Sequence, residues 1–396
     1  GERPSCRYGE RSSCRYGERS RRDAHLLDTV RAIVLVGGLG TRLRPLTWTV
    51  PKQMLPVAGR PMLERVLGHL AGYGVDEVVL SLGYRPDAFV DAYPDQRCAG
   101  VRLVYVMEPE PLDTAGAIRF AADQAGVDER FLVVNGDVLT DLDLGALFAM
   151  HDQAKAEGTI ALTRVDDPSH FGVVVLDEAG RVVTFVEKPP AGEAPSDLVN
   201  AGFYVLEPSV LGRIAPGRKV NIEREVFPAM AEAGTLYARA DPAYWLDVGT
   251  PDRYLQASLD MIAGTRSFPL EASGTIEVVG ELVAPVLLGR QVKVAAGAVV
   301  DGSVLGDDVT VGDGARVEAS VLLPGAVVEP RATVRGSVIG AGARVGAGSI
   351  VEEMSMLGHG FETGSGVHLR GALVPKADAS HRDESHHDGS PHKERS

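Results

Sequence analysis

The 396-residue chain has only three cysteines, Cys6, Cys14 and Cys98, and this small, odd number excludes a fold built on disulfides. It also lacks any run of about 18 uncharged apolar residues, so no segment is predicted to span a membrane. Basic residues are the minority, with 40 Lys plus Arg against 54 Asp plus Glu and a net charge of −14. This balance argues against broad binding to nucleic acid or anionic membranes. Any affinity for phosphate must come from a local site.

Apolar residues are plentiful enough for a packed interior. The hydrophobic fraction of 44% and the charged fraction of 24% are ordinary for a folded protein and exclude wholesale disorder. Because one hydrophobic core rarely grows beyond about 250–300 residues, a chain of this length is predicted to contain two or three domains.

Both ends of the chain are poor in the aliphatic residues that a core needs. Residues 5–12 and 13–20 repeat the same sequence, and we predict that residues 1–29 form a disordered, low-complexity extension. That extension has no apolar centre of the kind that secretion signals carry, so we expect a cytoplasmic protein. Residues 371–396 are polar and rich in histidine and are predicted to be a disordered tail. A metal site is not expected there because the tail lacks fixed geometry.

Residues 30–265 alternate short aliphatic segments with amphipathic ones. Strands are predicted at 31–36, 75–82, 101–106, 131–134, 159–164 and 203–206, and helices at 62–71, 115–125 and 144–157. Such alternation is typical of an α/β domain whose mostly parallel sheet is covered by helices on both faces. Ligands of these sheets bind beyond the carboxyl ends of the strands, which is where functional residues are expected.

Residues 266–370 have a different texture. No Phe, Tyr or Trp occurs between 276 and 360, and no histidine occurs between 270 and 358. Valine and glycine recur at steps of roughly six to seven residues, as in the segments 304–306, 311–315, 338–343 and 345–348. A hexapeptide period predicts a parallel β-helix in which aliphatic residues stack inward from coil to coil.

The predicted strand at 31–36 runs into a glycine-rich segment, Gly-Gly-Leu-Gly-Thr-Arg-Leu-Arg-Pro-Leu-Thr at 37–47, followed by Pro51 and Lys52. Glycines allow backbone N–H groups to approach a phosphate or a base closely. Arg42 adds a bidentate cation and Lys52 a compact one. The dinucleotide fingerprint and the P-loop both fail to fit, because Leu43 stands at the third glycine and no Gly-Lys-Ser/Thr is present.

Two aspartates stand where carboxylates at the ends of strands are expected. Asp137 ends the Asn-Gly-Asp of an apolar segment, and Asp247 lies in Trp-Leu-Asp-Val-Gly-Thr at 245–250. Two carboxylates together with substrate phosphates are a common way to hold Mg²⁺. Taken alone, either aspartate could instead be a turn residue or a helix cap.

The glycine-rich segment with its Pro-Lys resembles the sugar nucleotidyltransferases (NDP-sugar pyrophosphorylases), and the resemblance covers about residues 31–350. It implies a Rossmann-like, nucleotide-diphospho-sugar transferase fold followed by a left-handed parallel β-helix of hexapeptide repeats. The resemblance also implies the reaction of this family, in which a sugar 1-phosphate attacks the α-phosphorus of an NTP and pyrophosphate is released. A sugar phosphate is largely ionised near neutral pH, its second pKa being about 6, so no general base is needed. Positioning and charge neutralisation must supply the rate.

The resemblance also implies roles for individual residues. The nucleotide would be bound by Val36, Gly37, Gly38, Gly40, Thr41, Arg42, Lys52, Glu108, Asp113, Thr114 and Ala115. The sugar would be bound by Asn135, Gly136, Gly172, Glu187, Lys188, Asn200 and Gly202. Asp137 and Asp247 would hold Mg²⁺ and, with Arg42, Lys52 and Lys188, form the catalytic set. His170 is expected to be structural.

Glu108 is the main sequence indication of the base. Uridylyl and thymidylyl members of the family typically have Gln there, whereas a carboxylate only accepts hydrogen bonds and suits the N1–H and N2–H₂ donors of guanine. The chain most resembles the mannose-1-phosphate guanylyltransferases with a C-terminal β-helix, which implies GTP and mannose 1-phosphate as substrates. Asp113 departs from the family pattern, because Gly usually occupies its position in Leu-Gly-Thr-Ala-Gly.

Three alternatives remain. A glucose-1-phosphate thymidylyl-, uridylyl- or adenylyltransferase would share the catalytic set. A catalytically silent regulatory subunit would be expected to lose part of that set, which is complete here. An acyltransferase activity of the β-helix is disfavoured because that chemistry generally uses a His base and residues 270–358 contain none. The β-helix is expected instead to serve assembly or regulation, and we expect a homo-oligomer.

Overall fold

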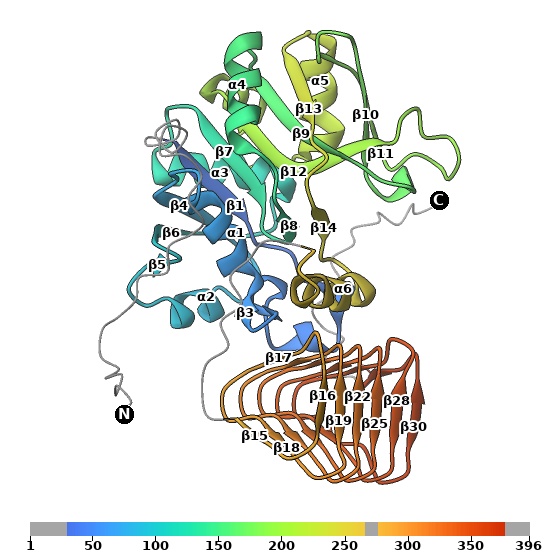
Figure 1. The fold of residues 1–396 in the computed structure, drawn as a ribbon. Coiled ribbons are helices and arrows are strands. Elements are labelled where there is room, and N and C mark those ends of the chain that lie inside the picture. Colours follow the sequence, from blue (N-terminus) through green and yellow to red (C-terminus); the bar gives the residue numbers. More distant parts are fainter. Residues whose placement is uncertain (1–29, 266–275, 377–396) are drawn as a thin grey trace, which may run out of the picture.

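The computed structural model describes residues 30–265 and 276–376, which form an α/β domain and a β-helix domain (Figure 1). The predicted extension at 1–29 and most of the predicted tail lie outside the described residues. Within them, no helix combines the length and the apolar character needed to cross a membrane.

The α/β domain is built on a mixed, mostly parallel sheet, as predicted. Its main path runs β11-β10-β12-β7-β1-β4-β6-β5, and β9 and β13 join through β12. The strands are β1 (Arg31–Leu35), β4 (Glu77–Leu82), β5 (Arg97–Cys98), β6 (Val101–Met107), β7 (Phe131–Asn135), β9 (Gly158–Arg164), β10 (Gly172–Leu176), β11 (Val182–Glu187), β12 (Leu198–Leu206) and β13 (Leu236–Ala240). Two short antiparallel pairs stand apart, β2 (Pro56–Val57) with β3 (Arg60–Pro61), and β8 (Val138–Thr140) with β14 (Trp245–Asp247).

Helices cover both faces of this sheet because its central strand is apolar on both sides. In β1, Ala32 and Val34 pack with one hydrophobic cluster and Ile33 with the other, and all three are fully buried. The first cluster includes residues of α1, α2, α4 and α6, and the second includes residues of α3 and α5. The helices are α1 (Met62–Ala71), α2 (Asp87–Ala92), α3 (Asp113–Ala125), α4 (Leu144–Ala154), α5 (Phe227–Glu232) and α6 (Pro251–Ile262).

Three details differ from the sequence-based expectations. Strand β12 begins at Leu198, earlier than predicted, and runs antiparallel to β7 and β9. Helix α3 begins at Asp113 rather than 115. Helix α4 ends at Ala154 rather than 157, because Lys155 adopts a left-handed conformation with a φ of 48° that terminates the helix.

The C-terminal domain is the predicted parallel β-helix, with three parallel sheets of short strands. One sheet contains β15 (Glu277–Val278), β18 (Lys293–Val294), β21 (Thr310–Val311), β24 (Val327–Val328) and β27 (Arg344–Val345). The second contains β16 (Glu281–Val283), β19 (Val299–Asp301), β22 (Arg316–Glu318), β25 (Thr333–Arg335), β28 (Ile350–Glu352) and β30 (His368–Arg370). The third contains β17 (Leu287–Leu288), β20 (Val304–Leu305), β23 (Val321–Leu322), β26 (Val338–Ile339), β29 (Met356–Leu357) and β31 (Leu373–Val374).

The coil length refines the predicted period. Ser303 and Ser320 occupy equivalent places 17 residues apart. The buried residues Val294, Val300 and Leu305 follow one another at steps of six and five residues, so one side of this coil is shorter than a hexapeptide, whereas the coil from Ile339 to Leu357 spans 18 residues. The domain also extends to Val374 rather than ending at 370, because β31 pairs with β29.

The β-helix is attached to the α/β domain through the third sheet. Its strands carry two consecutive apolar residues, and since neighbours in a strand point to opposite faces, only one of each pair points into the β-helix. Leu305 and Leu322 belong to the core of the β-helix, whereas Val304 and Val321 belong to the cluster that includes α1 and α6. Figure 1 shows this sheet below α6. One apolar cluster of the α/β domain therefore continues onto the outer face of the third sheet, while the interior of the β-helix forms a separate cluster.

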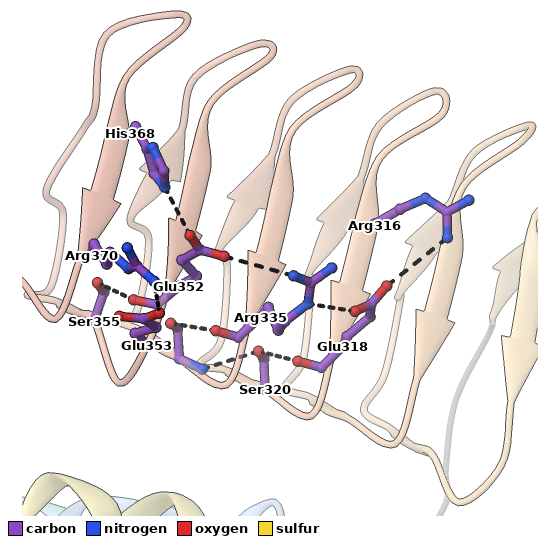
Figure 2. Close-up of polar contacts among 10 residues, drawn as sticks. Arg316, Glu318, Ser320, Arg335, Glu352, Glu353, Ser355, His368 and Arg370 are labelled. Carbon is purple, nitrogen blue, oxygen red and sulfur yellow. Dashed lines mark hydrogen bonds and ion pairs between the residues drawn. The ribbon is translucent and has the colours of Figure 1, made fainter.

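The second sheet instead presents charge to solvent. Glu318 pairs with Arg335 of the next coil at 2.7 Å, and Glu352 pairs with His368 at 2.9 Å (Figure 2). Beneath these charges runs a column of fully buried serines, Ser303, Ser320, Ser337 and Ser355. Each hydroxyl donates to a carbonyl of its own coil. The hydroxyls of Ser303, Ser320 and Ser355 also accept from backbone amides of the next coil, those of Ser320, Ser337 and Ala372 respectively.

We expect Ser320→Ala to destabilise the β-helix. The hydroxyl of Ser320 accepts from the Ser337 amide at 3.2 Å, and its loss leaves that buried N–H without a partner. Such a loss costs about 1–3 kcal/mol in the free energy of unfolding. Urea unfolding followed by circular dichroism should show a lower midpoint. The matched control Ser365→Ala removes an exposed hydroxyl of the same domain. Equal midpoints for the two variants would show that the column contributes nothing.

Candidate active site

Two connected cavities lie beside the strand ends of the α/β domain. The larger, of about 860 Å³, is lined by Arg42, Lys188 and Asp247 among others. The smaller, of about 160 Å³, shares Lys188 and Asp247 and continues to Asn135 and Asn200. The chain therefore brings its predicted catalytic cations and most of its predicted sugar-binding residues to one place.

The two predicted metal ligands lie next to each other although they are far apart in the sequence. Strands β8 and β14 pair antiparallel with Asp247 opposite Val138, and the amide of Val248 donates to the carbonyl of Asp137 at 2.9 Å. The ammonium of Lys52 forms an ion pair with Asp137. Lys52 is only 9% exposed, so this buried cation depends on a nearby carboxylate.

The surroundings separate the pKa values of these two aspartates. Burial raises the pKa of Asp137, but Lys52 and, more weakly, Arg42 outweigh it and hold the pKa below its ordinary value. Burial and the neighbouring carboxylate of Asp137 raise the pKa of Asp247 to about 6. The cavity thus contains two adjacent carboxylates whose mutual repulsion the available cations only partly relieve.

The pair fits a divalent cation that also binds substrate. Oδ1 of Asp247 is buried and has no hydrogen-bond partner among the described residues. No group of three or more His, Cys, Asp and Glu side chains in the described ranges could hold a metal ion. An ion here would therefore need oxygen ligands from phosphates or water in addition to these aspartates.

Arg42 is placed by the absence of a side chain at Gly249. A Cβ at Gly249 would lie 2.5 Å from Nη2 of Arg42 and 2.8 Å from Oδ1 of Asp247. The guanidinium therefore rests on the backbone that follows β14, beside the aspartates. Arg42 is otherwise exposed, as expected of a side chain that binds a ligand entering the larger cavity.

The glycine-rich segment after β1 has free backbone donors. Among the described residues, no hydrogen bond is formed by the amides of Gly37, Gly38 and Leu39. Gly40 has a φ of 61°, and its carbonyl accepts from the hydroxyl of Thr47 at 2.7 Å. Thr41 is exposed at the start of the following turn. This arrangement presents N–H groups as a phosphate or base would require.

Glu108, the residue predicted to read the base, borders this segment, and its role stays a prediction. Its Oε1 would be 3.2 Å from a Cβ at Gly37 and accepts from the hydroxyl of Ser81 at 2.9 Å. Its Oε2 accepts from the amide of Leu112 at 3.3 Å. The carboxylate is thereby fixed in orientation, while each oxygen keeps a further lone pair for a ligand.

Residues 113–115, which were also predicted to bind the nucleotide, form hydrogen bonds with residues 220–223. Asp113, with a φ of 60°, accepts from Asn221 at 3.0 Å, and the hydroxyl of Thr114 donates to Glu223 at 3.1 Å. The amide of Ala115 already donates to the carbonyl of Val220. Nucleotide contacts by Asp113, Thr114 and Ala115 therefore stay predictions.

Glycines at the smaller cavity permit close packing. A Cβ at Gly202 would lie 2.8 Å from Nδ2 of Asn135, and one at Gly172 would lie 2.6 Å from the Phe185 ring and 3.0 Å from Oε2 of Glu187. Gly136 packs against Val36, where a Cβ would come within 2.7 Å of Cγ1.

Asn200, which lies in an irregular stretch of β12, lines the smaller cavity. The register between β12 and β9 shifts between Asn200 and Tyr204, and Asn200 accepts from the amide of Gly202 at 2.9 Å. Nδ2 of Asn200 donates to the hydroxyl of Tyr204 at 2.9 Å. With Glu187 and Lys188 at the end of β11, the predicted sugar-binding residues surround one space.

Lys188 and His170 stand at the opening. The ammonium of Lys188 is 3.4 Å from Glu187, and its side chain is 59% exposed and able to reach a ligand. The side chain of His170 is 80% exposed and 3.9 Å from Asp167. His170 lines both cavities, so it does not have the buried position expected of a purely structural residue.

Three residues at the site were not predicted from the sequence: Glu223, Trp245 and Gly249. Trp245 lines both cavities, donates to the carbonyl of Ala201 at 2.9 Å and packs edge-on against Phe171. Its position two residues before Asp247 in a strand places both side chains on one face and could have identified it. Glu223 gives no such local signal, because the turn that carries it reaches the cavity only through tertiary packing.

We expect Gly249→Ala to impair activity with little loss of stability, because its Cβ would displace the flexible end of Arg42 rather than backbone. A displacement of about 1 Å at a catalytic group can lower turnover by about 100-fold. Initial rates of pyrophosphate release and thermal unfolding should be measured together. Gly212→Ala, whose Cβ would meet nothing within 4 Å, is the control. Normal turnover in Gly249→Ala would show that the position of Arg42 is not critical.

Comparisons with known proteins agree with this architecture. The family model described as nucleotidyl transferase matches residues 31–264, and the model described as GMPPB C-terminal domain matches residues 282–383. The mannose-1-phosphate guanylyltransferase of Mycobacterium tuberculosis is 40% identical over 287 residues, covering 69% of this chain and 79% of that protein. A probable mannose-1-phosphate guanylyltransferase of Oryza sativa is 35% identical over 360 residues, covering 87% and 95% of the two chains.

A similar solved structure is that of HddC from Yersinia pseudotuberculosis complexed with GMP-PN. It is 29% identical, with a TM-score of 0.51, and the match covers 59% of this chain and 99% of HddC. The family model alone accounts for more than half of the chain, and its bounds coincide with the α/β domain that carries both cavities. The chain therefore belongs to the nucleotidyl transferase family.

Proposed function

We propose that this protein is a mannose-1-phosphate guanylyltransferase, which forms GDP-mannose and pyrophosphate from GTP and mannose 1-phosphate. One observation carries the proposal: Asp137 and Asp247 lie between a phosphate-binding end with Arg42 and a smaller polar cavity with Glu187 and Asn200. A site that joins two phosphorylated substrates needs this order of cations, metal ligands and hydroxyl acceptors.

The reaction exchanges one bond at phosphorus for another. A phosphate oxygen of the sugar 1-phosphate forms a bond to the α-phosphorus of GTP, and the bond from the α-phosphorus to the oxygen bridging to the β-phosphorus breaks. Pyrophosphate leaves with that electron pair. The attacking phosphate is already ionised, so the residues of the site do not have to remove a proton.

The side chains supply position and charge. Arg42 and the glycine-rich segment bind the phosphates of GTP, and Lys52 neutralises negative charge beside Asp137. Lys188, whose side chain is largely exposed at the opening of the cavities, binds the phosphate of the sugar. Glu187 and Asn200 accept or donate hydrogen bonds to the ring hydroxyls.

Asp137 and Asp247 are the residues that would hold Mg²⁺. When bound, the ion would neutralise phosphate charge and fix phosphate geometry at this point. Oδ1 of Asp247 is buried and finds no hydrogen-bond partner in the described part of the chain, and the pKa of Asp247 is raised to about 6. Both observations support this assignment, because a cation beside both carboxylates would relieve their repulsion.

The preference for guanine rests on Glu108 and on the relatives. Its carboxylate is held beside Gly37 by Ser81 and accepts but does not donate hydrogen bonds, which matches the donor edge of guanine. The matched proteins from M. tuberculosis and O. sativa carry the name of this activity, and HddC was solved with GMP-PN.

We expect Arg42→Ala to lower kcat by about 100-fold to 1,000-fold, because one donor to the developing phosphate charge is lost. The variant should fold normally, since the side chain is exposed. Pyrophosphate release under saturating substrates measures the effect. Arg102→Ala, an exposed arginine on β6 outside both cavities, should retain full activity. Unchanged turnover in Arg42→Ala would remove this residue from the mechanism.

The nucleotide preference should change in Glu108→Gln. A panel of GTP, ATP, UTP and dTTP with mannose 1-phosphate and glucose 1-phosphate should rank GTP with mannose 1-phosphate first in the parent protein. In Glu108→Gln, kcat/KM for GTP should fall by about 10-fold to 100-fold through loss of charged hydrogen bonds, with a smaller loss for UTP. A parent protein that prefers UTP or dTTP with glucose 1-phosphate would contradict the proposal and identify a sister enzyme.

A further inference from the structure

We propose that Arg253, at the start of α6, binds the two terminal phosphates of the nucleotide and keeps this contact with the pyrophosphate that leaves. The proposal rests on the proposed function for the reaction, but not for the identity of the base or of the sugar. It assigns a phosphate-binding role to a residue outside both the glycine-rich segment and the catalytic set named above.

The two cavities have a definite order along the site. Asp247 and Lys188 line both cavities and therefore mark the place where these meet. Arg42 and Arg253 line only the larger cavity, whereas the predicted sugar-binding residue Asn200 lines only the smaller one. Arg253 therefore lies on the side of this junction that faces away from the sugar.

The geometry of the reaction places the leaving phosphates on that side. In a displacement at phosphorus, the attacking and the leaving oxygens are roughly in line, on opposite sides of the phosphorus atom. The sugar phosphate approaches from the smaller cavity, so the α-phosphorus lies at the junction and the β- and γ-phosphates extend into the larger cavity. The residues that line only the larger cavity are the ones able to contact them.

The cations of the larger cavity leave one candidate for this contact. Among the described residues, four Lys and Arg side chains line it: Arg42, Arg164, Lys188 and Arg253. Arg42 and Lys188 already have ligands in the proposed mechanism. The guanidinium of Arg164 is bound by both carboxylate oxygens of Asp197, which satisfies its charge within the protein. Arg253 is the cation of this group that still lacks a ligand.

The guanidinium of Arg253 is available because its contacts within the protein are long. Its Nη1 is 3.4 Å from Oε1 of Gln256, and its Nε is 3.9 Å from Oδ2 of Asp252. Both distances exceed those of a tight hydrogen bond. The side chain is 50% exposed, so it can turn toward a phosphate and bind two of its oxygens with parallel N–H groups.

Arg253 is also close to the predicted metal site. Helix α6 begins shortly after β14, the strand that ends at Asp247 (Figure 1). Burial raises the pKa of Asp247, and the positive charge of Arg253 is among the effects that oppose this rise. A phosphate chain bound at Asp247 through a cation would therefore lie within reach of the Arg253 guanidinium.

The backbone at the start of α6 favours the same ligand. Thr250 occupies the N-cap position, but its side chain forms no capping hydrogen bond. The amides of Asp252 and Arg253 form no hydrogen bond with any described residue. Amides at the N-terminus of a helix attract anions, so these two can assist the guanidinium in binding the terminal phosphates.

The reverse reaction tests the proposal, because GDP-mannose lacks the phosphates that Arg253 would bind. In Arg253→Ala, KM for pyrophosphate should rise by about 10-fold to 100-fold, while KM for GDP-mannose changes less than about twofold. Arg253→Lys keeps the charge but loses the paired donors, so its KM for pyrophosphate should rise less. Initial rates of GTP formation at varied concentrations of each substrate give both constants.

Gln256→Ala is the matched control. Gln256 lies one turn further along α6, is exposed and lines neither cavity, so both KM values should equal those of the parent protein. An unchanged KM for pyrophosphate in Arg253→Ala would overturn the inference. So would an equal rise in both KM values, because a general disturbance of the site would produce it.

A binding measurement separates this inference from the proposed function. Isothermal titration calorimetry with pyrophosphate and Mg²⁺ requires neither the base nor the sugar. The Kd for pyrophosphate should rise by about 10-fold to 100-fold in Arg253→Ala and stay unchanged in Gln256→Ala. A parent protein that prefers another nucleotide sugar would contradict the proposed function alone, whereas equal Kd values in the parent and Arg253→Ala would contradict the role of Arg253.

Discussion

The ion pair between Lys52 and Asp137 is the contact on which the candidate site depends. It keeps Asp137 ionised in a buried place and gives the buried ammonium of Lys52 its counter-charge. Removing either partner would leave an uncompensated charge, which is far more costly than removing both. Burial and the charge of Asp137 raise the pKa of the neighbouring Asp247, and Oδ1 of Asp247 has no hydrogen-bond partner among the described residues. The two adjacent carboxylates are therefore expected to bind a cation.

Charge is therefore distributed very unevenly in this acidic protein. The net charge of −14 argues against general affinity for polyanions, yet Arg42 and Lys188 line the larger cavity and Lys52 forms an ion pair with Asp137 of the smaller one. The β-helix also contacts this region: Gly358 packs so closely on Pro45 that a Cβ at Gly358 would lie 3.1 Å from Cβ of Pro45. The last coils thereby support the chain just after the glycine-rich segment. Assembly and regulation remain expectations for this domain.

Much of the fold followed from the sequence because it is encoded in local periodicity. The amphipathic spacing of 62–71 gave α1 with its observed bounds, and the change in texture near 276 predicted the β-helix. The antiparallel course of β12 was not predictable, because strand direction depends on tertiary pairing. The shorter side of the 17-residue coils was also missed, since glycine and valine at similar intervals do not mark where a side begins.

Individual residues of the candidate site could be predicted from sequence motifs, but the contacts between them could not. Asp137 and Asp247 were each identified from their motifs, but their adjacency depends on the pairing of two three-residue strands, which no period reveals. Glu223 and Gly249 were missed for a related reason, because their importance lies in what packs against them. The expected roles of the site residues came from the resemblance to a family. The contacts between these residues came from the structure.

The most direct measurement is the identification by mass spectrometry of the product formed from one mixture of equal amounts of GTP, ATP, UTP and dTTP with mannose 1-phosphate and glucose 1-phosphate. The account predicts that GDP-mannose is the dominant nucleotide sugar, formed together with an equal amount of pyrophosphate. A dominant product with another base or with glucose, or no nucleotide sugar in the presence of Mg²⁺, would contradict it.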